Sequence, residues 1–198
     1  VNDHEVFAAG EGGIVLQSFD QGETWREHTW FTSTVHDLFF LNGRCGWAVG
    51  DGGLIMHTHN GGRTWSSQNS STTASLSAVQ FSDALNGLAV GSSGTILRTV
   101  NGGVSWKLVR TDPQTHLSDV LTIDSQKAWA VGVSYSMAPG AEILSTTDGG
   151  QSWKQVDAGV PTDLGDEEGY PDWVSASLRA IAAFDDQTLA DEATRPGF

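Results

Sequence analysis

Short apolar runs separated by glycine-rich turns recur along the chain. In one copy, residues 47–50 (Trp-Ala-Val-Gly) form an apolar run, a turn follows at residues 51–53, and a second run covers residues 54–58. Runs of this length bounded by glycine are typical of buried β-strands. The Asn-Gly-Gly segment at residues 60–62 tolerates positive φ, so it reverses the chain into a further strand that begins at Trp65. The pattern predicts a β-hairpin.

This sequence repeat, called the phrase below, occurs four times, at residues 6–25, 46–65, 87–106 and 128–153. The copies end in Trp25, Trp65, Trp106 and Trp153, which are 40, 41 and 47 residues apart. A period of this length is typical of propellers and other repeat arrays. One more strand-like run lies outside each phrase, at residues 38–41, 76–81, 117–123 and 178–184. The predicted unit is four antiparallel strands, which is one propeller blade.

The end of each phrase matches the Asp-box or BNR motif, S/T-x-D/N-x-G-x-T/S-W, at residues 18–25, 58–65, 99–106 and 146–153. Together with the preceding G-W-A-V-G-x-x-G-x-I-x-x-T, the chain resembles the photosystem II stability and assembly factor family over residues 5–157 and part of 178–190. The resemblance implies a propeller that serves as a non-catalytic protein interaction scaffold, as an assembly factor or accessory subunit of a membrane-associated complex. It also implies an extracytoplasmic location, in a periplasm, a lumen or the secreted fraction.

The motif residues have a structural interpretation. The polar residues Asp20, Asn60, Asn101 and Asp148 are expected to cap their hairpins, and the tryptophans Trp25, Trp65, Trp106 and Trp153 are expected to be core residues because every blade repeats them. Asparagine replaces aspartate in two copies. A turn cap tolerates that exchange, whereas a role that depends on a carboxylate does not.

We expect one all-β propeller domain over residues 1–198. Its blades are predicted at about 1–30 with 178–190, 36–70, 76–111 and 117–157, and an acidic insertion occupies residues 157–177. Residues 5–30 supply three strands of a blade and residues 178–186 supply one. The two ends together supply the four strands of one blade. This favours a four-bladed ring in which residues 178–186 pair beside residues 5–10. The alternative is part of a larger propeller of about seven blades, the usual number in the family.

Composition and charge limit the partners. The 24 glycines and 38% apolar residues suit short strands joined by turns. A net charge of −14 opposes nucleic acid and anionic membranes and favours a protein partner with a basic surface. No run approaches the roughly 20 apolar residues of a transmembrane helix. The one cysteine, Cys45, has no internal disulfide partner.

Departures from the repeat indicate where a partner binds. All large departures fall on second-to-third turns and fourth-to-first connections, which emerge at one end of antiparallel blades. They combine aromatic and charged residues, as protein interfaces do. The alternatives are that Trp30 and Phe31 seal the gap between two blades and that the acidic segment is a solvated loop. The predicted partner-binding residues are Trp30, Phe31, Tyr135, Met137, Asp163, Asp166, Glu167, Glu168, Tyr170 and Trp173.

Metal binding and catalysis are weaker hypotheses. The acidic residues 163–168 lack the spacing of a calcium loop, and His57 and His59 point the same way from a strand without an apparent third ligand. No cofactor or metal is therefore expected. A sialidase or other glycoside hydrolase is the alternative function. Of the arginines, Arg179 alone lies on a predicted inner strand, so an arginine triad is not assembled, and Asp37 and Asp119 are the best placed carboxylates for a glycosidase pair.

Overall fold

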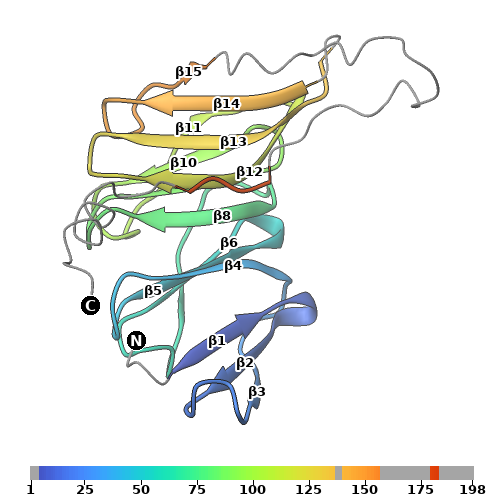
Figure 1. Cartoon of the computed structure of the whole chain (residues 1–198), viewed down its shortest axis with the longest axis vertical. Helices are drawn as coiled ribbons and strands as arrows, with labels where there is room; N and C mark the ends of the chain where they lie inside the picture. Colours follow the sequence, from blue (N-terminus) through green and yellow to red (C-terminus); the bar gives the residue numbers. More distant parts are fainter. Residues whose placement is uncertain (1–4, 137–139, 157–178, 183–198) are drawn as a thin grey trace, which may run out of the picture.

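The computed structural model of the chain describes residues 5–136, 140–156 and 179–182, which form an all-β fold (Figure 1). The strands are β1 (Val6–Ala9), β2 (Ile14–Ser18), β3 (Arg26–Thr29), β4 (Val35–Phe40), β5 (Gly46–Gly50), β6 (Leu54–Thr58), β7 (Ser66–Ser67), β8 (Leu76–Phe81), β9 (Gly87–Gly91), β10 (Ile96–Thr99), β11 (Lys107–Arg110), β12 (Thr115–Thr122), β13 (Ala128–Ser134), β14 (Gly140–Thr146) and β15 (Lys154–Gln155). Two short 3-10 turns, η1 (Glu11–Gly13) and η2 (Asp51–Gly53), are the helical elements of this described part, and neither could cross a membrane.

The strands form four antiparallel sheets in chain order. Three sheets have four strands each, in the orders β4-β5-β6-β7, β8-β9-β10-β11 and β12-β13-β14-β15, and the first has the order β1-β2-β3. The first strands of successive sheets lie against one another, β4 against β8 and β8 against β12. Each sheet is therefore a propeller blade whose first strand is innermost. The predicted all-β fold of four-stranded antiparallel blades is confirmed.

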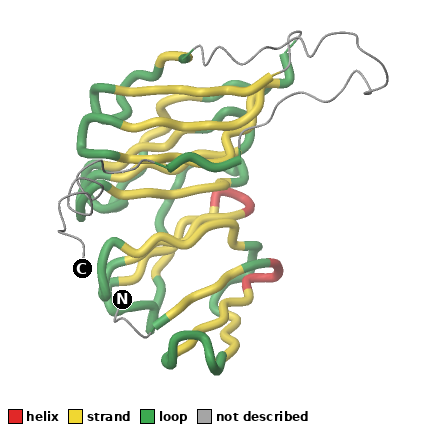
Figure 2. Tube along the Cα trace, viewed as in Figure 1, coloured by secondary structure: helices red, strands yellow, loops and turns green. Residues whose placement is uncertain are grey.

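The blades have two distinct ends. Figure 2 shows η1 and η2, in red, at one end of the sheets, where the second strand turns into the third. The box hairpins, which join the third strand to the fourth, lie at the opposite end. We call these the η end and the box end. This separation follows from the antiparallel order, because successive turns of a meander alternate between the two ends.

A close backbone approach explains why the second strands carry a glycine at equivalent positions. A Cβ built on Gly50 would lie 1.9 Å from the carbonyl oxygen of Thr34, on the connection that enters the first strand of the same blade. Gly91 and Gly132 stand in the same relation to Ser75 and His116, at 2.0 Å each. A Cβ on the corresponding residue of the first sheet, Gly10, would meet no atom within 4 Å. The difference arises because no described strand lies inside β1.

The expected closure of the ring differs from what the described residues form. Residues 179–182 are not in a strand, and no described residue pairs with the free edge of β1. The main-chain N–H of Ile181 instead donates to a carboxylate oxygen of Asp119, in β12, at 3.0 Å. In Figure 1 the sheet β1–β3 is at one end of the series of blades. The segment thus takes the place next to β12 that a following first strand would take, without pairing with β1.

Aromatic side chains fill the space between blades. The rings of Trp47 in β5 and Phe81 in β8 stack with centroids 3.6 Å apart, and Trp106 packs edge-on to Phe81 at 5.8 Å. Trp106 is buried, at 6% exposure, while Trp65 and Trp153 are half-buried against the core. Trp25 is 42% exposed, so the expectation of a core role is wrong for this residue. The first sheet gives Trp25 neither a first strand nor, among the described residues, a preceding blade to pack on.

Each box hairpin is closed by the same hydrogen bonds. A hydroxyl in the third strand accepts the main-chain N–H of the second glycine of the turn; for example, Thr99 Oγ1 accepts the N–H of Gly103 at 2.8 Å. The Asp or Asn side chain accepts the N–H four residues on, as Asn101 does from Ser105 at 3.0 Å. In the first hairpin the bonds from Thr24 lower the pKa of Asp20 to about 2. The side-chain oxygen therefore replaces solvent for main-chain donors of the turn.

Replacing Asn101 by alanine should destabilise the third blade. The substitution removes the acceptor for Ser105 N–H and the contact with the Thr99 hydroxyl. A lost hydrogen bond of this kind costs about 1 kcal/mol in the free energy of unfolding, measured by urea titration. The matched control is Asn101→Asp, which keeps the acceptor and copies the first and fourth blades, and should change stability little. Unchanged stability of Asn101→Ala would remove the capping role.

The glycines at the ends of the second strands provide a test of the free edge of β1. Gly50→Ala forces a Cβ against the main chain at Thr34 and should cost about 2 kcal/mol of unfolding free energy. Gly10→Ala has open space and should stay within about 0.5 kcal/mol of the unsubstituted chain. If Gly10→Ala proved as damaging as Gly50→Ala, a strand would cover β1 in solution.

Candidate functional site

A depression of about 630 Å³ lies at the η end of the innermost strands. It is formed where β4, β8 and β12 begin, together with the end of β13 and the segment 179–182. Most of the residues that line it have polar side chains, which supply hydroxyl, imidazole, phenol and guanidinium groups. The lining residues are His36, Ser75, Ser77, His116, Ser118, Val133, Tyr135 and Arg179.

A β-bulge at the start of each innermost strand directs a side chain into this depression. The register of β4 shifts between Val35 and Asp37, and β8 and β12 shift at the same place in the repeat. The extra residues are His36, Ser77 and Ser118, and all three line the depression. A bulge commonly re-aims a side chain in this way. Arg179 occupies the same repeat position, two residues before Ile181.

Hydrogen bonds fix part of the lining. The carboxylate oxygen Oδ1 of Asp51 lies 2.8 Å from His36 Nε2 and accepts the Ser75 hydroxyl at 2.8 Å. The bond from His36 is the main cause that lowers the pKa of Asp51. His116 Nε2 lies 3.5 Å from the Ser77 hydroxyl, and burial lowers the pKa of His116. The Ser75 hydroxyl therefore bonds a carboxylate directly, whereas the Ser77 hydroxyl lies beside an imidazole.

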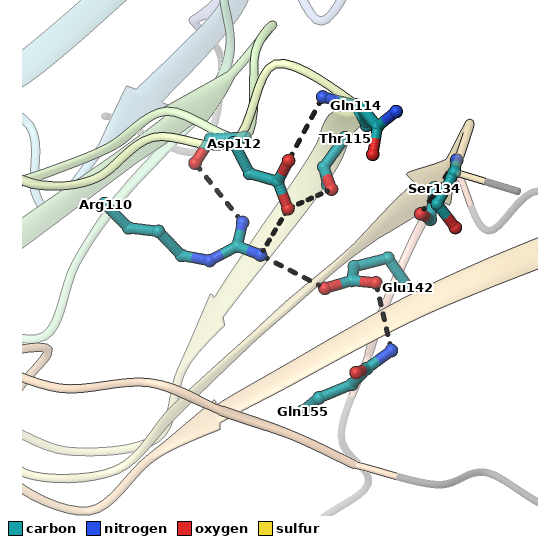
Figure 3. Close-up of polar contacts among 9 residues, drawn as sticks. Arg110, Asp112, Gln114, Thr115, Ser134, Glu142 and Gln155 are labelled. Carbon is teal, nitrogen blue, oxygen red and sulfur yellow. Dashed lines mark hydrogen bonds and ion pairs between the residues drawn. The ribbon is translucent and has the colours of Figure 1, made fainter.

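An ion-pair network borders the site where the third and fourth blades meet (Figure 3). Arg110 Nη2 lies 3.2 Å from Asp112 Oδ2 and 3.4 Å from Glu142 Oε1, and Gln155 Nε2 donates to the other oxygen of Glu142 at 3.2 Å. The Glu142 side chain is 5% exposed. Burial raises the pKa of Glu142, and the charge of Arg110 opposes that rise. The arginine therefore compensates a buried carboxylate.

The same network holds the rim of the depression. Asp112 accepts the Gln114 N–H at 3.1 Å and the Thr115 hydroxyl at 3.0 Å, which fixes the connection that enters β12. The carbonyl oxygen of Gln114 then accepts the main-chain N–H of Tyr135 at 2.6 Å. Tyr135 is consequently anchored through its backbone while its side chain stays 62% exposed.

The described residues separate the predicted partner-binding set into three groups. Tyr135 is exposed on the rim, as a contact residue would be. Phe31 is 4% exposed and packs edge-on to Trp65 with centroids 5.4 Å apart, so its predicted role as a partner anchor is wrong. It seals the gap between the first two blades, where Trp30 is half-buried and stacked on His28 at 4.1 Å. Outside the described residues lie Met137, Asp163, Asp166, Glu167, Glu168, Tyr170 and Trp173.

The two carboxylates considered for a glycosidase pair bind main-chain groups. Asp37 accepts the N–H of Leu38 at 2.8 Å and that of Val79, in the next blade, at 2.9 Å. Asp119 repeats the arrangement with Val120 at 2.8 Å and Ile181 at 3.0 Å. In each carboxylate, one oxygen therefore accepts the N–H of the next residue in its own strand, and the other oxygen reaches the main chain of the neighbouring inner segment. Burial raises the pKa of Asp37, and the two N–H donors oppose that rise.

His57, in β6, lies near the aromatic ring of Trp47, and His59 comes just after the end of β6. The His57 ring stacks on Trp47 with centroids 4.9 Å apart, and its centroid is 6.4 Å from that of His59. Burial lowers the pKa of His57. Within residues 5–136, 140–156 and 179–182, no group of three or more His, Cys, Asp or Glu side chains is placed to hold a metal ion.

Sequence reasoning did not single out the bulge residues. A signal was available, because the residues at one repeat position of the inner segments are all polar, namely His36, Ser77, Ser118 and Arg179. Polar residues that recur at one position of an inner strand indicate a shared surface at the centre of a propeller. The aromatic residues that depart from the repeat are more conspicuous in the sequence than these polar residues. Phe31, however, is one of them and is buried between blades.

The architecture is that of a β-propeller, and the comparisons with known proteins place the sequence more closely. The family described as photosynthesis system II assembly factor YCF48 matches residues 29–109 and 65–163. The chain therefore belongs to this family. A search of curated proteins found no match.

Solved structures share the fold. A structure of YCF48 bound to a D1 peptide is 20% identical, with a TM-score of 0.54, over 77% of this chain and 43% of the other. An ancestral GH74 enzyme gives 16% identity, a TM-score of 0.60 and coverage of 77% and 22%. The GH74 enzyme of Niastella koreensis is 14% identical, with a TM-score of 0.52, over 78% of this chain and 36% of the other. At these identities the likeness concerns the fold, and the chain spans less than half the length of each of these proteins.

Removing the arginine of the ion-pair network should destabilise the protein in a pH-dependent way. Arg110→Ala leaves Glu142 buried without its counter-charge, and we expect a loss of about 3 kcal/mol in unfolding free energy near pH 7. The folded-state pKa of Glu142 would rise further above its unfolded value of about 4.5, so the penalty should shrink as the pH falls through this raised pKa and be largely gone near pH 4.5. Urea unfolding at pH 7 and pH 4 measures both effects. When Arg110→Ala is introduced into Glu142→Gln, the loss of unfolding free energy relative to Glu142→Gln alone should depend little on pH. A loss that kept the same pH dependence would contradict the pairing of Arg110 with Glu142.

Proposed function

We propose that this chain is a non-catalytic protein-binding scaffold that assists assembly of a photosystem II-like membrane complex or forms an accessory part of it. Membership of the YCF48 assembly factor family is the observation that carries this proposal. The extracytoplasmic location implied by the resemblance is part of the same proposal.

The η end is the proposed binding surface. Its depression offers hydrogen-bonding groups from Arg179 and His116 and from the hydroxyls of Ser77 and Ser118, beside the exposed ring of Tyr135. Such donors suit the carbonyl and carboxylate oxygens of a peptide, and an exposed aromatic side chain can serve as an anchor. The YCF48 structure with a D1 peptide supports a peptide as the ligand class.

The wider partner is proposed to be basic. The chain carries a net charge of −14, which attracts a positively charged surface and accelerates encounter. The acidic segment with Asp163, Asp166, Glu167 and Glu168 lies outside the described residues and belongs to this proposal as a steering element. In this arrangement, a peptide enters the depression while basic residues of the partner face the acidic chain.

A glycoside hydrolase is the second candidate, because two GH74 enzymes share the fold. The carboxylates of Asp37 and Asp119 speak against it, since both oxygens of each accept main-chain N–H groups. A carboxylate held in this way is poorly placed to attack a sugar or to transfer a proton. Release of reducing sugar from a β-glucan, abolished by Asp37→Asn, would favour the enzyme instead.

Binding of a D1 peptide, followed by isothermal titration calorimetry, tests the proposed surface. Tyr135→Ala should reduce affinity by about 2 kcal/mol, roughly thirtyfold, because it truncates an exposed anchor while its backbone bond to Gln114 remains. The box-end substitutions Arg63→Ala and Gln151→Ala are controls and should leave the affinity unchanged. Equal binding by Tyr135→Ala, or loss of binding in the controls, would place the site elsewhere.

A further inference from the structure

At the box end, far along the strands from the depression, one blade differs from its neighbours. The first-to-second turn and the box hairpin of each blade are joined by one main-chain hydrogen bond, which fixes equivalent positions. The bonds run from Gly61 to the carbonyl of Arg44, from Gly102 to that of Leu85 and from Gly149 to that of Gln126, at 2.9, 2.9 and 2.8 Å. Arg44, Leu85 and Gln126 are therefore counterparts.

Two further positions of the box hairpin can be compared in the same way. The residue before the capping Asp or Asn is His59, Val100 or Thr147, and the residue after the second glycine is Arg63, Val104 or Gln151. The second and fourth blades thus carry polar or charged residues at all three positions. The third blade carries Leu85, Val100 and Val104, which we call the blade-three tip.

Packing does not explain the blade-three tip. Leu85, Val100 and Val104 are 57%, 49% and 84% exposed. The hairpin itself is held by main-chain and Asn101 contacts, and the second and fourth blades form the same contacts with polar residues at these positions. Three neighbouring apolar side chains directed to solvent are typical of a surface that another molecule covers.

The charges around the blade-three tip indicate which kind of partner could cover it. Asp83 accepts the main-chain N–H of Leu85 at 2.8 Å, so a carboxylate sits directly beside the tip, and Asp124 is exposed on the neighbouring turn across a crevice that also includes Lys127. The chain as a whole carries −14, which opposes a second copy and an anionic lipid surface. A partner that carries both apolar and basic side chains could pack on the apolar tip and pair with the carboxylates of Asp83 and Asp124.

We propose that the blade-three tip is a second docking surface, which binds a protein segment carrying apolar and basic side chains together. The surface is independent of the depression, because it lies at the opposite end of the blades. With two such surfaces, one chain can hold two protein segments at once, as a scaffold requires.

The repeat supplies matched variants for the test. Leu85→Gln with Val100→Thr and Val104→Gln gives the third blade the residues of the fourth. The reciprocal set, Gln126→Leu with Thr147→Val and Gln151→Val, gives the fourth blade an apolar tip. All six positions are exposed at a hairpin or turn, so both variants should keep the circular dichroism spectrum and melting temperature of the unsubstituted chain.

The probe is a labelled amphipathic peptide of about 14 leucine and lysine residues, compared with leucine–glutamate and serine–lysine peptides of equal length. We expect the leucine–lysine peptide alone to bind well, with about tenfold loss in the first variant and a gain in the reciprocal one. Equal affinity in the first variant, or equal binding of the serine–lysine peptide, would overturn the proposal by showing that charge alone attracts the probe.

Two other occupants would also overturn the proposal and are measured on the same proteins. Sedimentation equilibrium detects a dimer that the first variant loses, which would identify a second copy as the occupant. Flotation with phosphatidylcholine vesicles detects lipid binding that the first variant loses. We expect neither, because the chain should remain monomeric and unbound to vesicles.

Discussion

The blades depend on a contact between two stretches of backbone that leaves no room for a side chain. Gly50, Gly91 and Gly132 occupy equivalent positions of the second strands, where a carbonyl oxygen near the start of the first strand would lie within 2.0 Å of a Cβ built on the glycine. This approach brings the connection against the sheet before the first strand begins. The bulge that follows directs His36, Ser77 and Ser118 toward the centre. The candidate site is thus a consequence of how each innermost strand starts.

Neighbouring blades are joined by polar ties as well as by apolar packing. Asp37 and Asp119 reach from one innermost strand to the main chain of the next, and Arg110 links the third blade to a buried glutamate of the fourth. Such groups are costly to bury unless each oxygen has a donor, and here donors are supplied. The carboxylates of Asp37 and Asp119 therefore help to hold the inner segments together.

The two ends of the blades serve different chemistry. The η end gathers imidazole, hydroxyl and guanidinium groups around a depression, with Tyr135 on its rim. The box end repeats one hairpin whose side-chain bonds leave the outward positions free to vary, and the third blade fills them with leucine and valine. Because the hairpin is stabilised by Asn101 and its main-chain contacts, the outward residues contribute little to folding and are available for binding.

The sequence by itself determined the repeat, the strand order within each blade and the turn chemistry, because local backbone preferences of Asn-Gly-Gly segments and the spacing of apolar runs act within about 40 residues. It did not determine which side chains the blades bury against one another. Phe31 is buried between two blades, whereas Trp25 is exposed because no described blade precedes it. Asp37 accepts a hydrogen bond from the main chain of Val79 in the next blade. The polar lining of the depression likewise comes from residues up to 143 positions apart, His36 to Arg179. Such contacts join separate blades, so only the tertiary structure decides them.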